Sequence, residues 1–252
     1  MLFFFSLSGQ AFGFDIQGLQ PLEPNGVFTT FSAESCSKGK TAFSVGAEVS
    51  RESNFYRFTF KSAFGILDNL EMLATVPYVS GYDPGDGFED ISIGLKHRFF
   101  DEGKYGPSLA YVLHGSLPSG PDQLSTDGQI GFGLIMSKRV GPVNGHVNLF
   151  YSIPGKSRLD EQVSLLAGLD FAAAHNFKLL AEMYVRQSYN ANTVDLIEGR
   201  FGYRIQTTDF VYTTIGIGYD FKNRNPEYRI LFSVTFLYPY DKKEIKKIYE
   251  EE

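Results

Sequence analysis

The sequence predicts an all-β protein, a transmembrane antiparallel up-and-down β-barrel of about 12 strands. Apolar and polar residues alternate along about a dozen segments of the length that a tilted membrane-crossing strand needs. The links between these segments are alternately short and long. No stretch approaches the ~20 consecutive apolar residues of a transmembrane helix, so a chain that crosses a membrane must do so with strands.

Composition excludes several classes of protein. Of 252 residues, 43% are hydrophobic and 15% aromatic, which is typical of an ordered chain and, with 26 glycines, of a β-rich one. The net charge of -6 argues against nucleic acid as a partner. Cys36 is the only cysteine, which excludes an intramolecular disulfide and a cysteine-based metal site. Glycine motifs that cradle phosphates or nucleotides are absent from the sequence, and no cofactor is predicted.

Four regions are expected along the chain. Residues 1–13 combine an apolar run with small residues, the pattern of a signal peptide, here without a positive start and therefore expected to be truncated. Residues 14–40 are irregular, and we expect a periplasmic lead or a piece inserted into the lumen. Residues 41–239 form the predicted barrel. Residues 240–252 are a charged tail, expected to be a short helix or a frayed end.

The predicted strands are defined by a period of two. One face carries bulky apolar residues, and the other carries Gly, Ser, Thr and charged residues. The stretch 165–186 also fits an amphipathic helix, but the turn signal His175-Asn176 favours two strands. The alternation covers residues 43–50, 55–66, 70–78, 91–99, 109–113, 130–137, 146–153, 163–171, 177–186, 197–204, 211–221 and 228–238.

The links predict which end of the barrel faces which side of the membrane. Outer-membrane barrels have short periplasmic turns and longer external loops. With an even strand count and a periplasmic N-terminus, the short links all fall on the periplasmic side. The short links are 67–69, 101–106, 141–144, 174–176 and 206–209, and the long ones are 80–89, 118–127, 154–160, 187–191 and 222–226.

Side-chain volume decides which face is turned inward. About twelve strands, each sending four or five bulky residues into one lumen, would overfill it. We therefore expect the apolar face to contact outer-membrane lipid and the polar face to line the lumen. The final run, 228–238, ends in aromatic residues, a pattern that resembles the signal read by the barrel-assembly machinery.

The charged residues of the polar face are the candidate functional residues. They predict either a pore lining that sets solute and ion preference or a set of salt bridges that closes the lumen. Positive residues somewhat outnumber negative ones, which predicts a weak preference for anions if the lumen is open. The predicted lumen-lining residues are Glu48, Arg57, Lys61, Glu71, Lys96, Arg98, Asp170, Glu182, Arg186, Glu198, Arg200 and Arg229, with Lys178 and Arg204 on the same face.

Two other kinds of site receive little support from the sequence. A hydrolase needs a nucleophile, a base and an orienting group in contact, and the G-x-S-x-G motif is absent. His146 shares a face with Ser152, but their spacing is too long for contact. Asp83, Asp86, Glu89 and Asp90 offer oxygen ligands for calcium, but EF-hand spacing is missing, which favours a solvated acidic loop.

Several phrases resemble an outer-membrane "transporter" family named for the MetA pathway of phenol degradation. They lie at 18–35, 65–79, 88–103 and 117–152, so the resemblance covers most of the chain. These phrases are turn-plus-strand signatures, and none is a catalytic motif. The resemblance implies an outer-membrane barrel that moves small, often hydrophobic or aromatic compounds, and it implies no functional residues.

Three hypotheses follow for function. The first is a barrel in the outer membrane of a Gram-negative-type bacterium that lets small-molecule solutes cross passively, without enzymatic activity. The second is a closed structural or binding barrel, blocked by ion pairs and by residues 14–40. In it, loss of the charge of Arg57, Lys96 or Arg200 opens a leak, whereas in an open pore the same loss only changes selectivity. The third is an outer-membrane hydrolase.

Overall fold

A computed structural model describes residues 17–50, 55–81, 85–190, 193–222 and 228–239. The predicted signal peptide, 1–13, and the predicted tail, 240–252, lie outside the described residues. Asp83 of the acidic loop also lies outside them. The predicted barrel region and residues 17–40 of the segment before it can therefore be placed in space.

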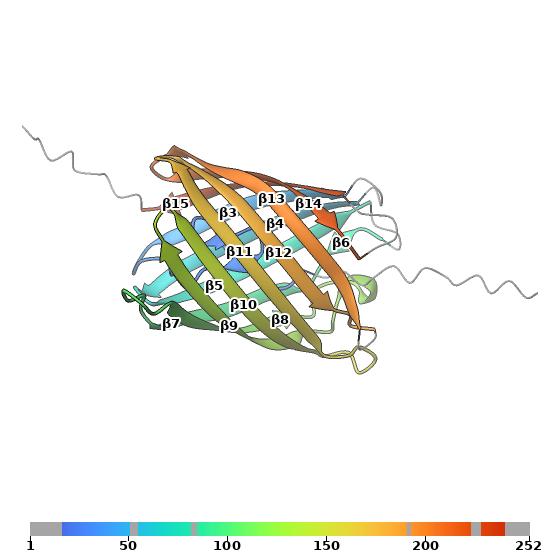
Figure 1. Cartoon of the computed structure of the whole chain (residues 1–252). Coiled ribbons are helices and arrows are strands. Elements are labelled where there is room, and N and C mark those ends of the chain that lie inside the picture. The colour runs from blue at the N-terminus through green and yellow to red at the C-terminus, as the bar shows by residue number, and fades with distance from the viewer. Residues whose placement is uncertain (1–16, 51–54, 82–84, 191–192, 223–227, 240–252) are drawn as a thin grey trace, which may run out of the picture.

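Twelve antiparallel strands form a closed ring, which confirms the predicted all-β barrel (Figure 1). Each strand pairs with its neighbour in the chain, and the last strand pairs with the first, Thr235 lying opposite Ser44. The ring strands are β3 (Thr41–Ser50), β4 (Phe55–Leu67), β5 (Leu70–Ser80), β7 (Ile91–Phe100), β8 (Ser108–Leu117), β9 (Gln129–Val140), β10 (Val143–Pro154), β11 (Gln162–Ala174), β12 (Phe177–Gln187), β13 (Val194–Thr208), β14 (Val211–Asp220) and β15 (Tyr228–Tyr238).

The stretch 165–186 is two strands and not a helix. Strands β11 and β12 pair from Ser164 opposite Arg186 to Ala174 opposite Phe177, with the predicted turn between them. Bulky residues here face outward at every second position, so the period of two outweighs the local resemblance to an amphipathic helix. The only helical element in the described ranges is the 3-10 turn η1, Asp122–Leu124, and no helix there is long and apolar enough to cross a membrane.

Short and long links segregate to opposite ends of the ring. Residues 68–69, 101–107, 141–142, 175–176 and 209–210 connect strands at the end where β3 begins and β15 ends. We refer to this as the short-link end. The long links lie at the other end, the long-link end, where residues 118–128 and 155–161 connect the strands.

The predicted loop 80–89 differs from the structure. Residues 87–88 form the short strand β6 (Gly87–Phe88), which pairs with β5, so the loop ends earlier than expected. Thr75 lies opposite Ser92, whereas Tyr78 lies opposite Phe88. The segment 88–92 therefore contains one extra residue relative to β5. This β-bulge breaks the alternation and turns two consecutive acidic side chains, Glu89 and Asp90, into the lumen.

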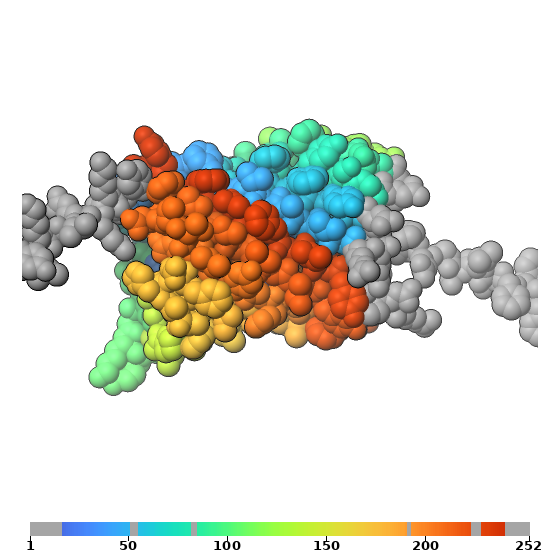
Figure 2. Space-filling model, turned by 90° about the horizontal axis from the view of Figure 1, so that it is seen from above, coloured from blue at the N-terminus to red at the C-terminus, as the bar shows by residue number. Residues whose placement is uncertain are grey.

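Most bulky apolar side chains face outward around the ring, as predicted, whereas Leu73, Val112 and Ile135 are buried in an apolar cluster with residues 19–36. Phe43, Leu149 and Ile217 each expose between 47% and 61% of their surface, while their chain neighbours point inward. The outer wall is continuous where the C-terminal strands meet β3 and β4 (Figure 2). A soluble protein does not present so large an apolar surface to water, and a transmembrane barrel presents it to lipid.

We expect the substitution Leu149→Arg to destabilise the barrel in lipid. Leu149 lies midway along β10, opposite Leu134 and Leu165, on the outer face. An arginine on the lipid face near the bilayer midplane costs about 2–4 kcal/mol. Urea titration of the protein in lipid vesicles, followed by heat-modifiable gel mobility, should show this loss of unfolding free energy. Leu149→Met serves as the control, and an Arg variant as stable as the Met variant would contradict the lipid-facing assignment.

Candidate functional site in the lumen

Residues 17–40 run through the inside of the ring (Figure 1). At the long-link end, Gln17 donates a hydrogen bond to Glu89 through its backbone N–H and another to Glu48 through its side chain. At the short-link end, Gly39 N–H donates to Gly65 O, just before β3 begins. The segment also contains the short hairpin β1 (Gly26–Val27) and β2 (Thr30–Phe31). We call residues 17–40 the lumenal segment.

Glu182 on β12 is the strongest attachment point for the hairpin turn. One oxygen of its carboxylate accepts hydrogen bonds from Thr29 N–H at 2.8 Å, Thr30 N–H at 2.7 Å and the Thr30 hydroxyl at 2.8 Å. Arg200 donates to the Thr29 hydroxyl and lies 3.4 Å from the other Glu182 oxygen. A buried carboxylate requires such donors, because without them its transfer from water would be prohibitively costly.

Asn148 on β10 holds the second hairpin strand as a neighbouring strand would. Its carbonyl oxygen accepts from Phe31 N–H at 2.6 Å, and its amide nitrogen donates to Phe31 O at 2.9 Å. Ala33, two residues further along the segment, donates its N–H to the Ser137 hydroxyl at 2.8 Å. Polar side chains of the wall thus satisfy the backbone of a segment that lies in no larger sheet.

Lys96 and Glu71 hold the segment near the short-link end. Their side chains form an ion pair of 2.7 Å. Lys96 also donates to the carbonyl oxygens of Ser32 and Glu34, and Glu71 accepts from Cys36 N–H at 2.6 Å. Each side chain of this pair therefore bonds both its partner and the backbone of the segment.

Glu23 is the one acidic side chain of the segment that bonds several strands. Its carboxylate accepts from the hydroxyls of Ser233 and Thr235 at 2.8 and 2.7 Å and lies 3.6 Å from Lys61 Nζ. Arg204 lies nearby and donates to two backbone oxygens of the segment, Pro24 O and Gly26 O. The segment is thus attached to β3, β4, β13 and β15 as well as to the strands already described.

Glycines on the inner face make room for the segment. A methyl group added at Gly94 would collide with Leu19, and one added at Gly216 would collide with the ring of Phe28. At Gly168 the added carbon would lie 3.0 Å from Thr30 Cβ. The small residues of the inner face therefore match the bulk of the segment, as a packed interior requires.

An ion-pair belt joins the charges near the long-link end. It runs along the side chains of β4, β3, β15, β13 and β12, with contacts between 2.6 and 3.7 Å. Removing one partner of a buried pair typically costs about 3–5 kcal/mol, because the other charge is left uncompensated. In order of contact the belt comprises Glu89, Arg57, Glu48, Arg229, Glu198, Arg200 and Glu182.

Each of the twelve predicted lumen-lining side chains contacts the lumenal segment or a charged side chain of another element. Seven of them contact the lumenal segment: Glu48, Lys61, Glu71, Lys96, Arg98, Glu182 and, through Thr29, Arg200. The others are Arg57, Glu198 and Arg229 in the ion-pair belt, Arg186 beside Asp195, and Asp170 beside Lys178. Their role in solute passage stays a prediction.

Ser137, His146 and Asp170 lie side by side on three adjacent strands, which the sequence argument missed. Ser137 Oγ is 2.8 Å from His146 Nδ1, and His146 Nε2 is 3.6 Å from an Asp170 oxygen. Ser152 was excluded as a partner of His146 on its spacing, and the tight link at 141–142 instead sets Ser137 opposite His146. Ser137 Oγ accepts from Ala33 N–H and is buried, so it acts here as an anchor of the segment.

The link 118–128 folds over the long-link end. Asp90 accepts hydrogen bonds from Thr126 N–H and hydroxyl, both at 2.8 Å, and Leu124 packs against Phe55 and Val79 of the inner wall. Lys156 also holds the link. Its Nζ donates to Ser125 O at 2.7 Å and lies 2.9 Å from the Asp122 carboxylate, whose pKa this hydrogen bond and charge lower.

The acidic loop contains no assembled metal site in its described part. Asp86 accepts hydrogen bonds from Ser80 and Gly81 outside the lumen, whereas Glu89 and Asp90 point inward to different partners. Among the described residues, no three His, Cys, Asp or Glu side chains are grouped to hold a metal ion. The bulge separates the carboxylates that the sequence places close together.

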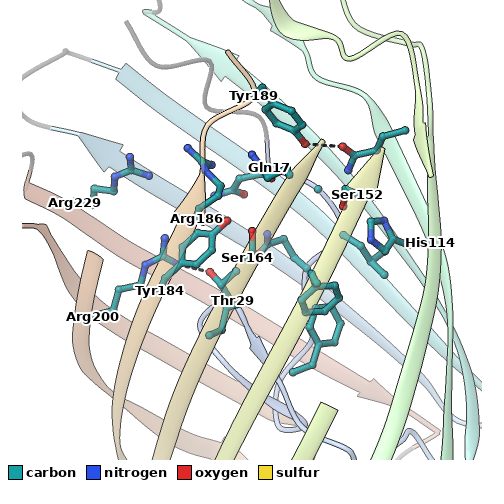
Figure 3. A pocket seen from close by; sticks show the side chains of 18 residues that line it. Gln17, Thr29, His114, Ser152, Ser164, Tyr184, Arg186, Tyr189, Arg200 and Arg229 are labelled. Atoms are coloured by element: carbon teal, nitrogen blue, oxygen red, sulfur yellow. Dashed lines mark hydrogen bonds between the residues drawn. The ribbon is translucent and has the colours of Figure 1, made fainter. Parts of the chain in front are cut away.

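A cavity of about 70 Å³ remains between the lumenal segment and the strands at the long-link end (Figure 3). One wall carries the arginines of β12, β13 and β15, and the facing wall carries Phe31 and Phe150, whose ring centroids are 5.5 Å apart. The arginines are Arg186, Arg200 and Arg229, and the lining includes Leu19, His114, Ser152, Ser164, Leu166, Tyr184 and Tyr189.

The closed ring, the outward apolar face and the polar, charged lumen define the chain as a transmembrane β-barrel with the fold of outer-membrane channels. No family model and no curated protein matches the sequence. The resemblance to the phenol-degradation family therefore stays a prediction.

Solved structures of outer-membrane channels share the fold. The COG4313 outer membrane channel from Pseudomonas putida F1 matches with a TM-score of 0.64 at 12% identity, over 82% of this chain and 98% of that one. The NanC porin matches with a TM-score of 0.57 at 11% identity, over 77% and 98% of the two chains. The KdgM porin matches with a TM-score of 0.54 at 8% identity, over 77% and 98%. At these identities the similarity concerns the fold.

We expect Asn148→Ala to loosen the lumenal segment without unfolding the ring. Loss of both hydrogen bonds leaves the backbone N–H and C=O of Phe31 buried without these partners, at about 1–3 kcal/mol for each unsatisfied group. Hydrogen–deuterium exchange of peptides covering 28–36 should therefore accelerate by at least tenfold. Asn144→Ala is the matched control, since Asn144 faces the lumen from the same strand and is absent from the segment contacts described above. Equal exchange in the two variants would contradict the anchoring role.

Proposed function

We propose that this chain is an outer-membrane channel of a Gram-negative-type bacterium that passes small molecules, with its conductance limited by the lumenal segment. The observation that carries the proposal is the lumenal segment itself. It is attached by polar side chains, through hydrogen bonds and ion pairs that water can replace. An apolar cluster adds to this attachment, in which Leu19, Leu22, Phe31, Ala33 and Cys36 pack against inward residues of the ring.

The fold shared with solved channels supports the proposal that this chain is an outer-membrane channel. Channels and porins have the same closed ring with a polar interior. The aromatic and hydrophobic solutes implied by the phenol-degradation resemblance remain part of the proposal for solute class.

The second candidate function is a closed structural or binding barrel. The observation that favours it is the same filled lumen, together with the ion-pair belt and the link 118–128 over the long-link end. The two candidates differ in a measurable quantity. A channel conducts in at least a fraction of its conformations, whereas a closed barrel does not conduct until a contact inside the lumen is removed.

Planar-bilayer recording of the refolded full chain, combined with liposome swelling in small sugars and small aromatic solutes, tests the proposal. We expect brief openings of low conductance and measurable solute entry. Silent bilayers and unswollen liposomes, from protein that shows heat-modifiable gel mobility, would instead establish the closed barrel.

We expect Lys96→Met to increase conductance severalfold. The substitution removes the donor to Ser32 O and Glu34 O and the ion-pair partner of Glu71, so it weakens three contacts near the short-link end. The matched control is Lys178→Met, because Lys178 pairs with Asp170 and is absent from the segment contacts described above. An equal rise in both variants would indicate a general weakening of the barrel and would sink the idea that the segment limits passage.

A further inference from the structure

The cavity beside the lumenal segment has two chemically different walls. Figure 3 shows Arg186, Arg200 and Arg229 on one side and His114 with Ser152 on the other. Phe31 and Phe150 form an aromatic pair on the side of His114, whose ring centroid lies 6.0 Å from that of Phe150. A molecule in this space would meet guanidinium groups at one end and apolar carbon at the other.

The charge of the lining favours an anion. Of the 18 lining residues, three are arginines and none is Asp or Glu. The carboxylates that pair with these arginines, such as Glu198 with Arg200, lie outside the lining. A guanidinium has five N–H donors, so it can bond a second carboxylate besides its structural partner.

Tyr184 orients two of these arginines. The guanidinium carbons of Arg186 and Arg200 lie 5.9 and 5.8 Å from the centre of its ring. Such cation–π contacts and the ion pairs hold the guanidinium groups in place before any ligand arrives, which lowers the entropy that binding must overcome. The guanidinium groups of Arg186 and Arg200 are therefore preorganised for a ligand.

A second lumenal cavity provides an internal comparison. It has a volume of about 60 Å³ and is lined by Glu23 and Glu48 as well as by Lys61 and Arg200. Its charges are therefore balanced, and its lining does not select an anion. The arginine wall distinguishes the first cavity.

The size of the first cavity limits the ligand. At about 70 Å³ it is roughly half as large as the ~150 Å³ apolar cavity that holds benzene in an engineered protein. An aromatic ring with a carboxylate would not fit without displacement of the segment. A short aliphatic chain of about three or four carbon atoms, one of them a carboxylate, would fit this space.

We propose that this cavity binds a short-chain aliphatic carboxylate, with the carboxylate on the arginines of β12, β13 and β15 and the hydrocarbon against Phe31, Phe150 and Leu166. The proposal rests on the proposed function and adds to it an anionic class of solute, distinct from the aromatic and hydrophobic solutes named there. The site lies on the inner wall at the long-link end, beside the lumenal segment.

Binding of propionate to the full chain in detergent micelles tests the site separately from passage. Saturation-transfer NMR with propionate, its neutral analogue propionamide and the larger benzoate gives the comparison. We expect at least fivefold more transfer to propionate than to propionamide, and less to benzoate than to propionate. Equal transfer to propionate and propionamide would overturn the anion site, and stronger transfer to benzoate would overturn the assignment of size.

Two matched variants locate the site within the lumen. Arg186→Gln should reduce propionate transfer at least threefold, and Arg186→Lys should restore part of it because the positive charge returns. Arg98→Gln is the control, since Arg98 lies at the short-link end beside Glu34 and Asp101. Equal losses in Arg186→Gln and Arg98→Gln would overturn this location. If Arg186→Gln loses its heat-modifiable mobility, Arg229→Gln takes its place.

The propionate-binding measurement does not depend on whether the barrel conducts. Propionate binding in micelles together with silent bilayers would leave the site standing and reject the channel. Conductance without selective binding of propionate would leave the channel standing and reject the site.

Discussion

The structure depends on mutual satisfaction of buried polar groups in the lumen. The inner faces of the strands carry charges that a narrow, protein-filled interior tolerates only when they are paired. The lumenal segment carries backbone N–H and C=O groups with no larger sheet to bond them. Each supplies what the other lacks: the Glu182 carboxylate receives three donors, and the Phe31 backbone receives both of its partners from Asn148.

The membrane imposes the complementary constraint on the outside. Lipid offers no hydrogen-bond partners, so every strand must bond two neighbours and the ring must close at β3 and β15. The same strands turn most large apolar side chains outward and keep mainly glycine, serine and charged residues inward, with a few apolar residues such as Leu73 and Val112 packed against the segment. Since the bulk lies outside, enough internal space is left for residues 17–40, and Gly94, Gly168 and Gly216 lie where the segment comes closest.

The sequence predicted those properties that a period of two determines. The inward direction of Arg200 and Glu182 follows from parity along their strands, and the ring and its alternating links follow from the repeated pattern. The contacts of the lumenal segment could not be predicted, because residues 14–40 have no period that fixes their direction. The contact between Thr29 and Arg200 is one that could not be predicted for this reason. Glu89 and Asp90 were misplaced because a bulge changes parity without a marker in the sequence. Ser137 and His146 could have been paired, since the two-residue link 141–142 sets their register.

The position of the lumenal segment at the start of the chain has a consequence for assembly. Thr30 bonds Glu182 across a sequence separation of 152 residues, and Glu23 bonds Thr235 across 212. The residues synthesised before the first ring strand therefore complete their contacts only after the last ring strand exists. Contacts of such long range form late, because the entropy of closing so long a loop is lost before the contact stabilises anything. In the final step of folding, the seam between β3 and β15 thus closes around the lumenal segment. The Glu23 carboxylate of that segment bonds both of these strands.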